Sequence, residues 1–390
     1  MNQPGIHALP IAGLQPVANM KQHWVAAWCH LPARFPGSQL APLLAGDNGL
    51  FDALGSLSLI LPCPDPFSWN SIEVDKLPHG RLILALPASR CGVPSLEPQL
   101  RSLQSAGARF VVAGCLPPGF KIAPQIEAMM FDMSIGQIAL ARDTMSQMRG
   151  AHLASRVDSN AQMLECKAAG FSWLCGDYAL QPGGIKMEAT SRSRLLKLLA
   201  LVARDAEARE LEVLLKQDLG LSFHLLKLVN SAAFAPATPI TSFTQAINVL
   251  GRRQLQRWLQ LLLYARSDES GAANPLLPLA ALRASLMEGL CRASGGDAAM
   301  CEKAFMSGMF SLLPMALEGA LDEVIATLKL DEQVVQAILR QGGELGRLLD
   351  LVDAASRGRS LPDSGDISPA EWWQAMGQAW RWASVVIREA

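Results

Sequence analysis

Two patterns of apolar residues divide the chain near residue 185. Before that point, short apolar runs rich in Val, Ile and Leu alternate with stretches whose apolar residues recur at helical spacing. This alternation predicts βα units and a largely parallel sheet. From about residue 190, helical spacing dominates to the end of the chain. The predicted strands are 24–29, 57–61, 82–86, 110–114, 135–140, 152–157 and 171–175.

The patterns predict three regions along the chain. Residues 1–20 carry Pro and Gly at intervals and are expected to form a flexible arm. Residues 21–184 are expected to form an α/β domain, and residues 190–390 a helical domain. A complete (β/α)₈ barrel usually takes about 250 residues. The α/β region is much shorter, so its barrel is expected to be tightly trimmed or incomplete.

The most strongly patterned stretch lies between Leu225 and Leu263. It reads as three short helices joined by tight turns and a proline loop, which would form a compact helical core. A basic cluster, Arg252, Arg253 and Arg257, begins the third helix. The cluster has two interpretations: an anion or nucleotide site, or a solvated face whose arginine stems pack on the core.

Composition narrows the classes of partner. Half of the residues are hydrophobic, yet no run reaches the roughly 18 uninterrupted apolar residues that a membrane span needs. The first residues lack a basic start followed by an apolar core, so no secretory signal is predicted. A formal net charge of −1 gives no reason to expect nucleic acid or an anionic membrane. The expected location is the cytoplasm.

Residues that could carry metal chemistry are few. His224 is the one histidine of the helical region, so the several His and Asp ligands of a helical phosphohydrolase site are missing. In the α/β region, Asp132 and Asp158 are the acidic residues at predicted strand ends, and two isolated carboxylates do not make a two-metal site. Eight widely spaced cysteines without a CxxC pair are expected to be buried free thiols. No catalytic residue, metal or cofactor is therefore predicted.

The last predicted helix, 368–388, is rich in tryptophan. Trp372, Trp373 and Trp380 are expected to pack on the rest of the helical domain. The alternative is that they contact the N-terminal domain or a partner protein.

The stretch after Leu225 strongly resembles the HDOD domain, a helical relative of the HD and HD-GYP phosphohydrolases. Downstream, Ser311-Leu312 stands where a catalytic HD domain would carry its His-Asp pair. The resemblance therefore implies this fold without its metal-binding residues. The matching features are Leu228-Val229-Asn230-Ser231-Ala232, Phe234, Pro239-Ile240, Ala246-Ile247 and Leu250-Gly251 followed by Arg252 and Arg253.

The N-terminal half is similar to the EAL domain that precedes HDOD in a class of bacterial signalling proteins. Arg156-Val157-Asp158 and the helix after it look like the end of an EAL barrel, and Cys175-Gly176-Asp177-Tyr178 resembles its terminal Gln-Gly-Tyr. The Glu-Ala-Leu signature and the family's acidic metal ligands are absent from the sequence. The resemblance implies a truncated or degenerate EAL-like (β/α) barrel followed by an HDOD-type helical domain.

These observations predict a non-enzymatic bacterial signal-transduction protein that acts as a protein-interaction or regulatory module. Protein partners of unknown identity are expected, a second copy of the chain among them, with Trp372, Trp373 and Trp380 as interaction residues. One alternative is a sensor that binds cyclic di-GMP or another nucleotide without cleaving it, through Arg252, Arg253 and Arg257. A second alternative is a residual metal-dependent cyclic di-GMP phosphodiesterase that uses Asp132 and Asp158.

Overall fold

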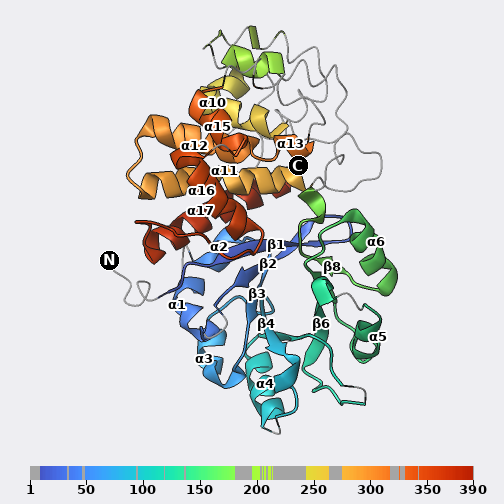
Figure 1. Cartoon of the computed structure of the whole chain (residues 1–390). Helices are drawn as coiled ribbons and strands as arrows, with labels where there is room; N and C mark the ends of the chain where they lie inside the picture. Colours follow the sequence, from blue (N-terminus) through green and yellow to red (C-terminus); the bar gives the residue numbers. More distant parts are fainter. Residues whose placement is uncertain are drawn as a thin grey trace. The chain divides into compact units, whose positions relative to one another are not determined.

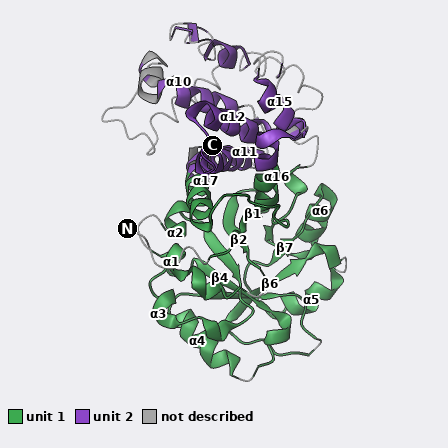
Figure 2. Cartoon of the chain, turned by 60° about the vertical axis from the view of Figure 1, so that its left-hand side comes forward, with its two compact units in different colours: residues 1–181, 350–381 green, residues 182–349, 382–390 purple. Residues whose placement is uncertain are grey.

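Two compact units make up the chain in the computed structural model (Figure 2). One unit contains Met1–Gln181 together with Asp350–Arg381, and the other contains Pro182–Leu349 together with Trp382–Ala390. The segment Asp350–Arg381, expected within the helical domain, thus groups with the N-terminal unit. The structure describes residues 9–32, 35–45, 49–93, 95–117, 119–135, 138–180, 196–202, 204, 206–207, 210–211, 213, 243–262, 275–316, 325, 330–340 and 342–389.

Eight strands close into a barrel in chain order (Figure 1). Strands β2 to β8 run parallel to one another, whereas β1 is antiparallel to both of its neighbours, β2 and β8. The strands are β1 (Gly13–Asn19), β2 (Trp24–His30), β3 (Ser58–Pro62), β4 (Leu82–Pro87), β5 (Arg109–Ala113), β6 (Ile126–Asp132), β7 (Leu153–Ser155) and β8 (Trp173–Leu174).

The predicted barrel is confirmed. Its ring of strands is closed, and the segments that connect the strands are short. Three of the helices that follow its strands have only four residues each, so a closed ring fits into a short stretch of chain. The helices are α1 (Ala41–Leu44), α2 (Leu50–Ala53), α3 (Ser71–Val74), α4 (Leu96–Ser105), α5 (Ala139–Met145) and α6 (Asn160–Ala169). Helix α6 begins at the cap Ser159, whose side chain accepts from Gln162 N–H, and ends at the left-handed Gly170.

The expectation of a flexible arm over residues 1–20 is wrong for β1. Pro16, in the middle of this run, cannot donate to a strand ladder and argues against a strand on local grounds. In the barrel, β1 pairs with β2 from Gly13 opposite His30 to Ala18 opposite Trp24. Burial of Leu14 and Val17 in the core stabilises a strand that local propensity does not favour.

The expected strand at 135–140 is also wrong. The sixth strand lies earlier, at Ile126–Asp132, and Met133–Ile135 is a short 3₁₀ turn before α5. Ala128 and Met130 of β6 point into the barrel core, which selects this run over the next one. Small residues fill much of that core, as a narrow eight-stranded barrel requires. Its buried members are Val17, Ala26, Ile60, Ile83, Ala85, Val111, Ala128, Met130, Leu153 and Cys175.

Three tryptophans of the last helix pack against the first strands of the barrel and the residues just before them. Helix α17 (Pro369–Glu389) begins with a capping box, in which Ser368 and Glu371 satisfy each other's backbone N–H groups. Trp372 Nε1 donates to the Ala12 carbonyl at 2.9 Å, and Trp373 Nε1 to the Pro10 carbonyl at 3.0 Å.

The ring of Trp380 lies 5.2 Å from that of Trp24 in β2. Trp372, Trp373 and Trp380 are all buried, and the described contacts are with the N-terminal segment. This arrangement corresponds to the alternative in which the tryptophans contact the N-terminal domain. It leaves a partner-binding role for them as a prediction.

The second unit is helical, as expected. Helix α10 (Phe243–Leu262) is kinked at Gly251, whose φ of 71° lies in the left-handed region. Helices α11 (Leu276–Ala293) and α12 (Ala298–Phe310) pack closely, because Gly308 has no side chain to keep it from the backbone of Arg283. The remaining helices are α13 (Leu313–Ala316), α15 (Glu332–Ile338) and the first part of α16 (Gly343–Ser356). The predicted helix end at 228–231 and the proline loop after it lie outside the described residues.

None of the described helices is both long enough and apolar enough to cross a membrane.

Candidate functional site

Polar side chains gather at the carboxyl-terminal end of the parallel strands. This is the end at which barrel enzymes place their functional residues. β2 ends at His30 and β6 at Asp132. Arg156 and Asp158 follow β7, and Asp177 follows β8. We call these five residues the mouth cluster.

His30 is held as a neutral imidazole. Its Nε2 lies 2.9 Å from Gln15 Oε1 of β1, and its ring stacks on Trp28 with centroids 5.0 Å apart. Burial, and next the positive charge of Arg156, lowers the pKa of His30 to about 4. The ring is therefore uncharged at neutral pH and offers an aromatic face together with the half-buried Trp28.

Arg156 is the cation of the mouth cluster, and its side chain is exposed. Its φ of 55° is unusual for a residue other than glycine, and such backbone strain is often found at functional sites. The side chain is 67% exposed, and Nη1 lies 3.9 Å from Asp132 Oδ2. The other oxygen of Asp132, Oδ1, accepts from the backbone N–H and the hydroxyl of Ser134. Arg156 thus presents an accessible guanidinium, which suits a phosphate group.

Asp158 and Asp177 have different surroundings. Asp158 lies just before α6, where its backbone N–H donates to Gln162, and its Oδ1 lies 3.5 Å from the Asp177 nitrogen. Asp177 accepts hydrogen bonds from two arginines that lie about 180 positions along the chain, Arg357 and Arg359. The two carboxylates proposed from the sequence, Asp132 and Asp158, both lie at the mouth. The sequence did not predict that Asp177 and the arginines that bind it would lie there too. No local pattern marks that pairing, because its partners are distant in sequence.

The mouth cluster does not fit a divalent ion. Throughout the described part of the chain, no three His, Cys, Asp or Glu side chains come together so that they could hold a metal. Asp132 is engaged by Ser134 and Asp177 by arginine.

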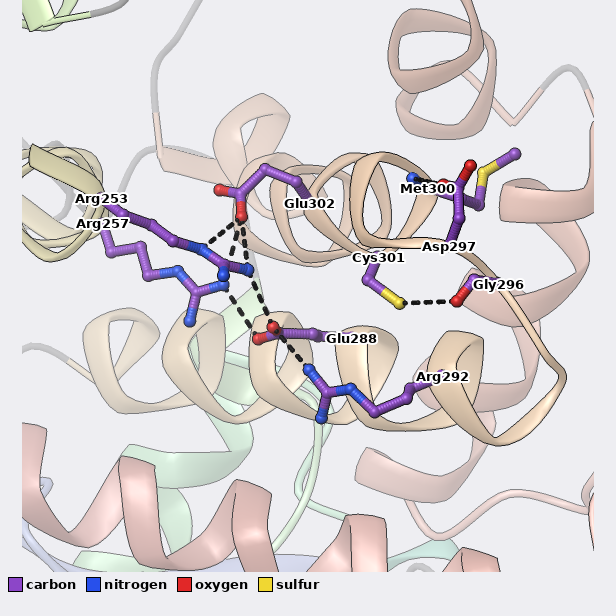
Figure 3. A network of polar contacts seen from close by, with 9 residues as sticks. All are labelled: Arg253, Arg257, Glu288, Arg292, Gly296, Asp297, Met300, Cys301 and Glu302. Atoms are coloured by element: carbon purple, nitrogen blue, oxygen red, sulfur yellow. Dashed lines mark hydrogen bonds and ion pairs between the residues drawn. The ribbon is translucent and has the colours of Figure 1, made fainter.

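The basic cluster of the helical unit forms an ion-pair network (Figure 3). Arg253 contacts Glu288 at 3.1 Å and Glu302 at 2.8 Å, and Arg257 contacts the same two carboxylates at 3.0 and 3.3 Å. Arg292 joins the network through Glu288 at 3.0 Å. The glutamates therefore neutralise much of the charge on which the predicted anion site depends.

The two arginines differ in their environment. The Arg257 side chain is 12% exposed, and its guanidinium lies 3.8 Å above the centre of the Phe305 ring, whereas Arg253 is 56% exposed. The side chain of Arg252 lies outside the described residues. A ligand-binding role for the three arginines stays a prediction. The geometry shows Arg253 and Arg257 joining α10 to α11 and α12.

Ser311 occupies the position where the resemblance places the first residue of a catalytic pair. It is buried, its hydroxyl donates to the Gly308 carbonyl at 2.7 Å, and Arg283 Nη1 donates to it at 3.3 Å. The side chain is used in packing α11 against α12.

With this geometry in place, comparison with known proteins decides the family of the helical unit. Residues 190–314 match the HDOD domain family. The chain therefore contains an HDOD domain. The predicted order, a (β/α) barrel followed by an HDOD domain, is confirmed by this match and by the closed eight-stranded barrel that precedes it.

Two curated relatives resemble part of the chain. The cyclic di-GMP phosphodiesterase CdgJ of Vibrio cholerae is 30% identical over 206 residues, which are 52% of this chain and 47% of CdgJ. The uncharacterized protein YuxH of Bacillus subtilis is 25% identical over 205 residues, which are 51% of this chain and 50% of YuxH. The chain spans about half the length of the curated relatives it matches. Among solved structures, the EAL domain of Mycobacterium smegmatis DcpA is similar with a TM-score of 0.35 and 14% identity, over 43% of this chain and 89% of that one.

The expectation that this chain is not an enzyme is contradicted. CdgJ, with 30% identity to half of this chain, is named as a phosphodiesterase. The expectation rested on counting His and Asp in the sequence, and missing ligand types alone do not establish that a protein lacks activity.

The ion-pair network predicts unequal effects for its two arginines. Replacement of Arg257 with Ala removes the inner cation of the network while Arg253 still pairs with both glutamates, so the free energy of unfolding should fall by about 1.5–3 kcal/mol, the usual contribution of hydrogen bonds to charged groups. Arg253→Ala is the matched control, because an exposed pair contributes about 0–1 kcal/mol. Urea unfolding followed by tryptophan fluorescence measures both. Equal losses for the two variants would contradict the network as described.

A second prediction concerns the titration of His30. Because the unfolded chain binds a proton near pH 6.5 and the folded chain near pH 4, the stability contributed by neutral His30 is present above pH 6.5 and is lost as the pH falls towards 4. Nuclear magnetic resonance of the imidazole protons should show an apparent pKa of His30 well below 6.

Arg156→Gln should raise that pKa, since it removes the second cause of the shift, while burial keeps it below 6.5. An ordinary titration of His30 near pH 6.5 in the unaltered protein would show that the ring is not enclosed as described.

Proposed function

We propose that the chain acts in cyclic di-GMP signalling and binds this dinucleotide at the mouth cluster of its barrel. The exposed, strained Arg156 beside the Trp28–His30 stack is the observation that carries the proposal. The name of the relative CdgJ supports the choice of ligand.

The mouth cluster offers a complement for each part of a cyclic dinucleotide. The guanidinium of Arg156 suits a phosphodiester oxygen, because charged hydrogen bonds to phosphate are short and strong. The face formed by Trp28 and neutral His30 suits a guanine ring, since stacking of a base on an aromatic side chain contributes about 1–3 kcal/mol. Asp132, with one oxygen near Arg156, offers an acceptor for the N–H donors of guanine.

Hydrolysis of cyclic di-GMP is a second candidate function, favoured by the name of CdgJ. Water would add to one phosphorus atom, one phosphorus–oxygen ester bond would break, and the released sugar oxygen would take a proton, leaving a linear dinucleotide. This candidate uses Asp132 and Asp158, the two carboxylates that the sequence suggested for a residual phosphodiesterase. A regulatory role through protein partners, including a second copy of the chain, stays a prediction.

Calorimetric titration with cyclic di-GMP tests the binding proposal. The unaltered protein should bind, and Arg156→Ala should weaken binding about 10-fold to 100-fold, because a hydrogen bond between charged groups contributes about 1.5–3 kcal/mol. Arg101→Ala is the matched control: Arg101 is also 67% exposed, but it lies on α4 and pairs with Glu97. Its affinity should be unchanged.

Chromatography of the linear product tests hydrolysis. The unaltered protein and the variants Asp132→Asn and Asp158→Asn are each incubated with cyclic di-GMP and Mg²⁺ or Mn²⁺. Turnover that is reduced in Asp132→Asn or Asp158→Asn would support the second candidate. Absence of heat at millimolar cyclic di-GMP, with the folded state verified by circular dichroism, would refute binding at the mouth cluster.

A further inference from the structure

The end of helix α16 lies against the mouth cluster. Gly358 follows the helix with a φ of 62°, and Arg359 N–H donates back to the Ala354 carbonyl at 2.9 Å. This is a Schellman end, in which a left-handed glycine lets the chain turn sharply away from the helix. The turn places an arginine on each side of Gly358.

Two glycines, which have no side chain, allow the turn after α16 to pack closely against the barrel. A methyl group at Gly358 would collide with the His30 imidazole and the Gln15 side chain. One at Gly13, the first residue of β1, would lie 2.5 Å from the Ala355 carbonyl oxygen. Backbone of the C-terminal segment therefore touches the residues that form the His30 side of the mouth.

Arg357 anchors this contact. Its Nε and Nη2 bind both oxygens of Asp177 at 2.6–2.9 Å, and its Nη1 binds Asp353 at 3.1 Å. All three side chains are at most 17% exposed. A pairing of this kind, bidentate and largely buried, is costly to break from one side.

Arg359 is different. It contacts the same Asp177 through one bond, Nη2 to Oδ2 at 2.7 Å, and its side chain is 55% exposed. Because Arg357 already binds both oxygens of Asp177, Arg359 is a second cation on one carboxylate. The Arg359 side chain is exposed and Asp177 keeps both bonds to Arg357, so the Arg359 guanidinium can leave Asp177 without leaving this carboxylate unpaired.

We propose that Arg359, which the C-terminal segment contributes, binds phosphate at the mouth. Without a ligand, Arg359 pairs with Asp177. The inference rests on the proposed binding of a cyclic dinucleotide and adds a second contact to it. Such a ligand carries two phosphodiester groups. Arg156 lies at the mouth beside Asp132, and Arg359 follows the glycine that packs against the ring of His30. On binding, Arg359 exchanges Asp177 for a phosphate oxygen, while Arg357 keeps the segment in place.

Calorimetry of the full chain with cyclic di-GMP tests the assignment through three variants. Arg359→Ala should weaken binding about tenfold and leave the melting temperature within about 2 °C, because Asp177 stays paired with Arg357 in this variant. Arg359→Lys should recover part of the affinity, since it keeps the charge but not the planar donor pair. Arg381→Ala is the control: Arg381 lies on the same segment and is 44% exposed, but it pairs with Asp52 of α2.

The outcomes separate this inference from the one it rests on. Binding by the unaltered protein and the control, weakened in Arg359→Ala and partly restored in Arg359→Lys, would support a phosphate contact. Binding that is equal in all variants would overturn the role of Arg359 and leave the mouth as the binding site. Loss of affinity together with a large fall in melting temperature would show a structural role and overturn the assignment. Absence of binding in the unaltered protein would overturn both proposals.

Discussion

The barrel depends on contacts between its first strand and the last part of the chain. β1 is a weak strand by its own sequence, because Pro16 interrupts it and Gly13 begins it. Around it, Trp372 and Trp373 donate to the carbonyls of Ala12 and Pro10, and the end of α16 reaches Gly13. Trp380 packs on Trp24 of the neighbouring strand. Residues 350–381 are therefore part of the unit whose strands begin the chain.

Residues 350–381 also shape the candidate site. The glycine turn after α16 leaves no room for a side chain beside His30, and Arg357 fixes it to Asp177 just beyond β8. Burial keeps His30 neutral, so the positive charge at the mouth comes from arginines. Arg156 is supplied by the barrel, and Arg359 by the C-terminal segment. The proposed site for a ligand with two phosphates thus takes one arginine from the barrel and one from the C-terminal segment.

Sequence reasoning found the elements whose signals are local. The strands predicted at 24–29, 57–61 and 82–86 lie within one residue of β2, β3 and β4, because apolar runs of this length are a local signal of buried strands. It failed where tertiary contacts decide: β1 carries a proline, and β6 competes with an equally apolar run after it. Asp132 and Asp158 were found from their places at strand ends. The Asp177–Arg357–Arg359 group was not, since nothing in a sequence of this kind relates positions 180 residues apart.

Residues 350–381 and the barrel are expected to unfold as one cooperative unit. Native-state hydrogen exchange of the intact chain, followed by mass spectrometry at increasing urea, measures this because cooperative units open with a shared free energy. Amides of β1, β2 and residues 369–381 should become exposed together, with one free energy of opening. Exchange of 369–381 together with α11 and α12, while β1 and β2 remain protected, would contradict it.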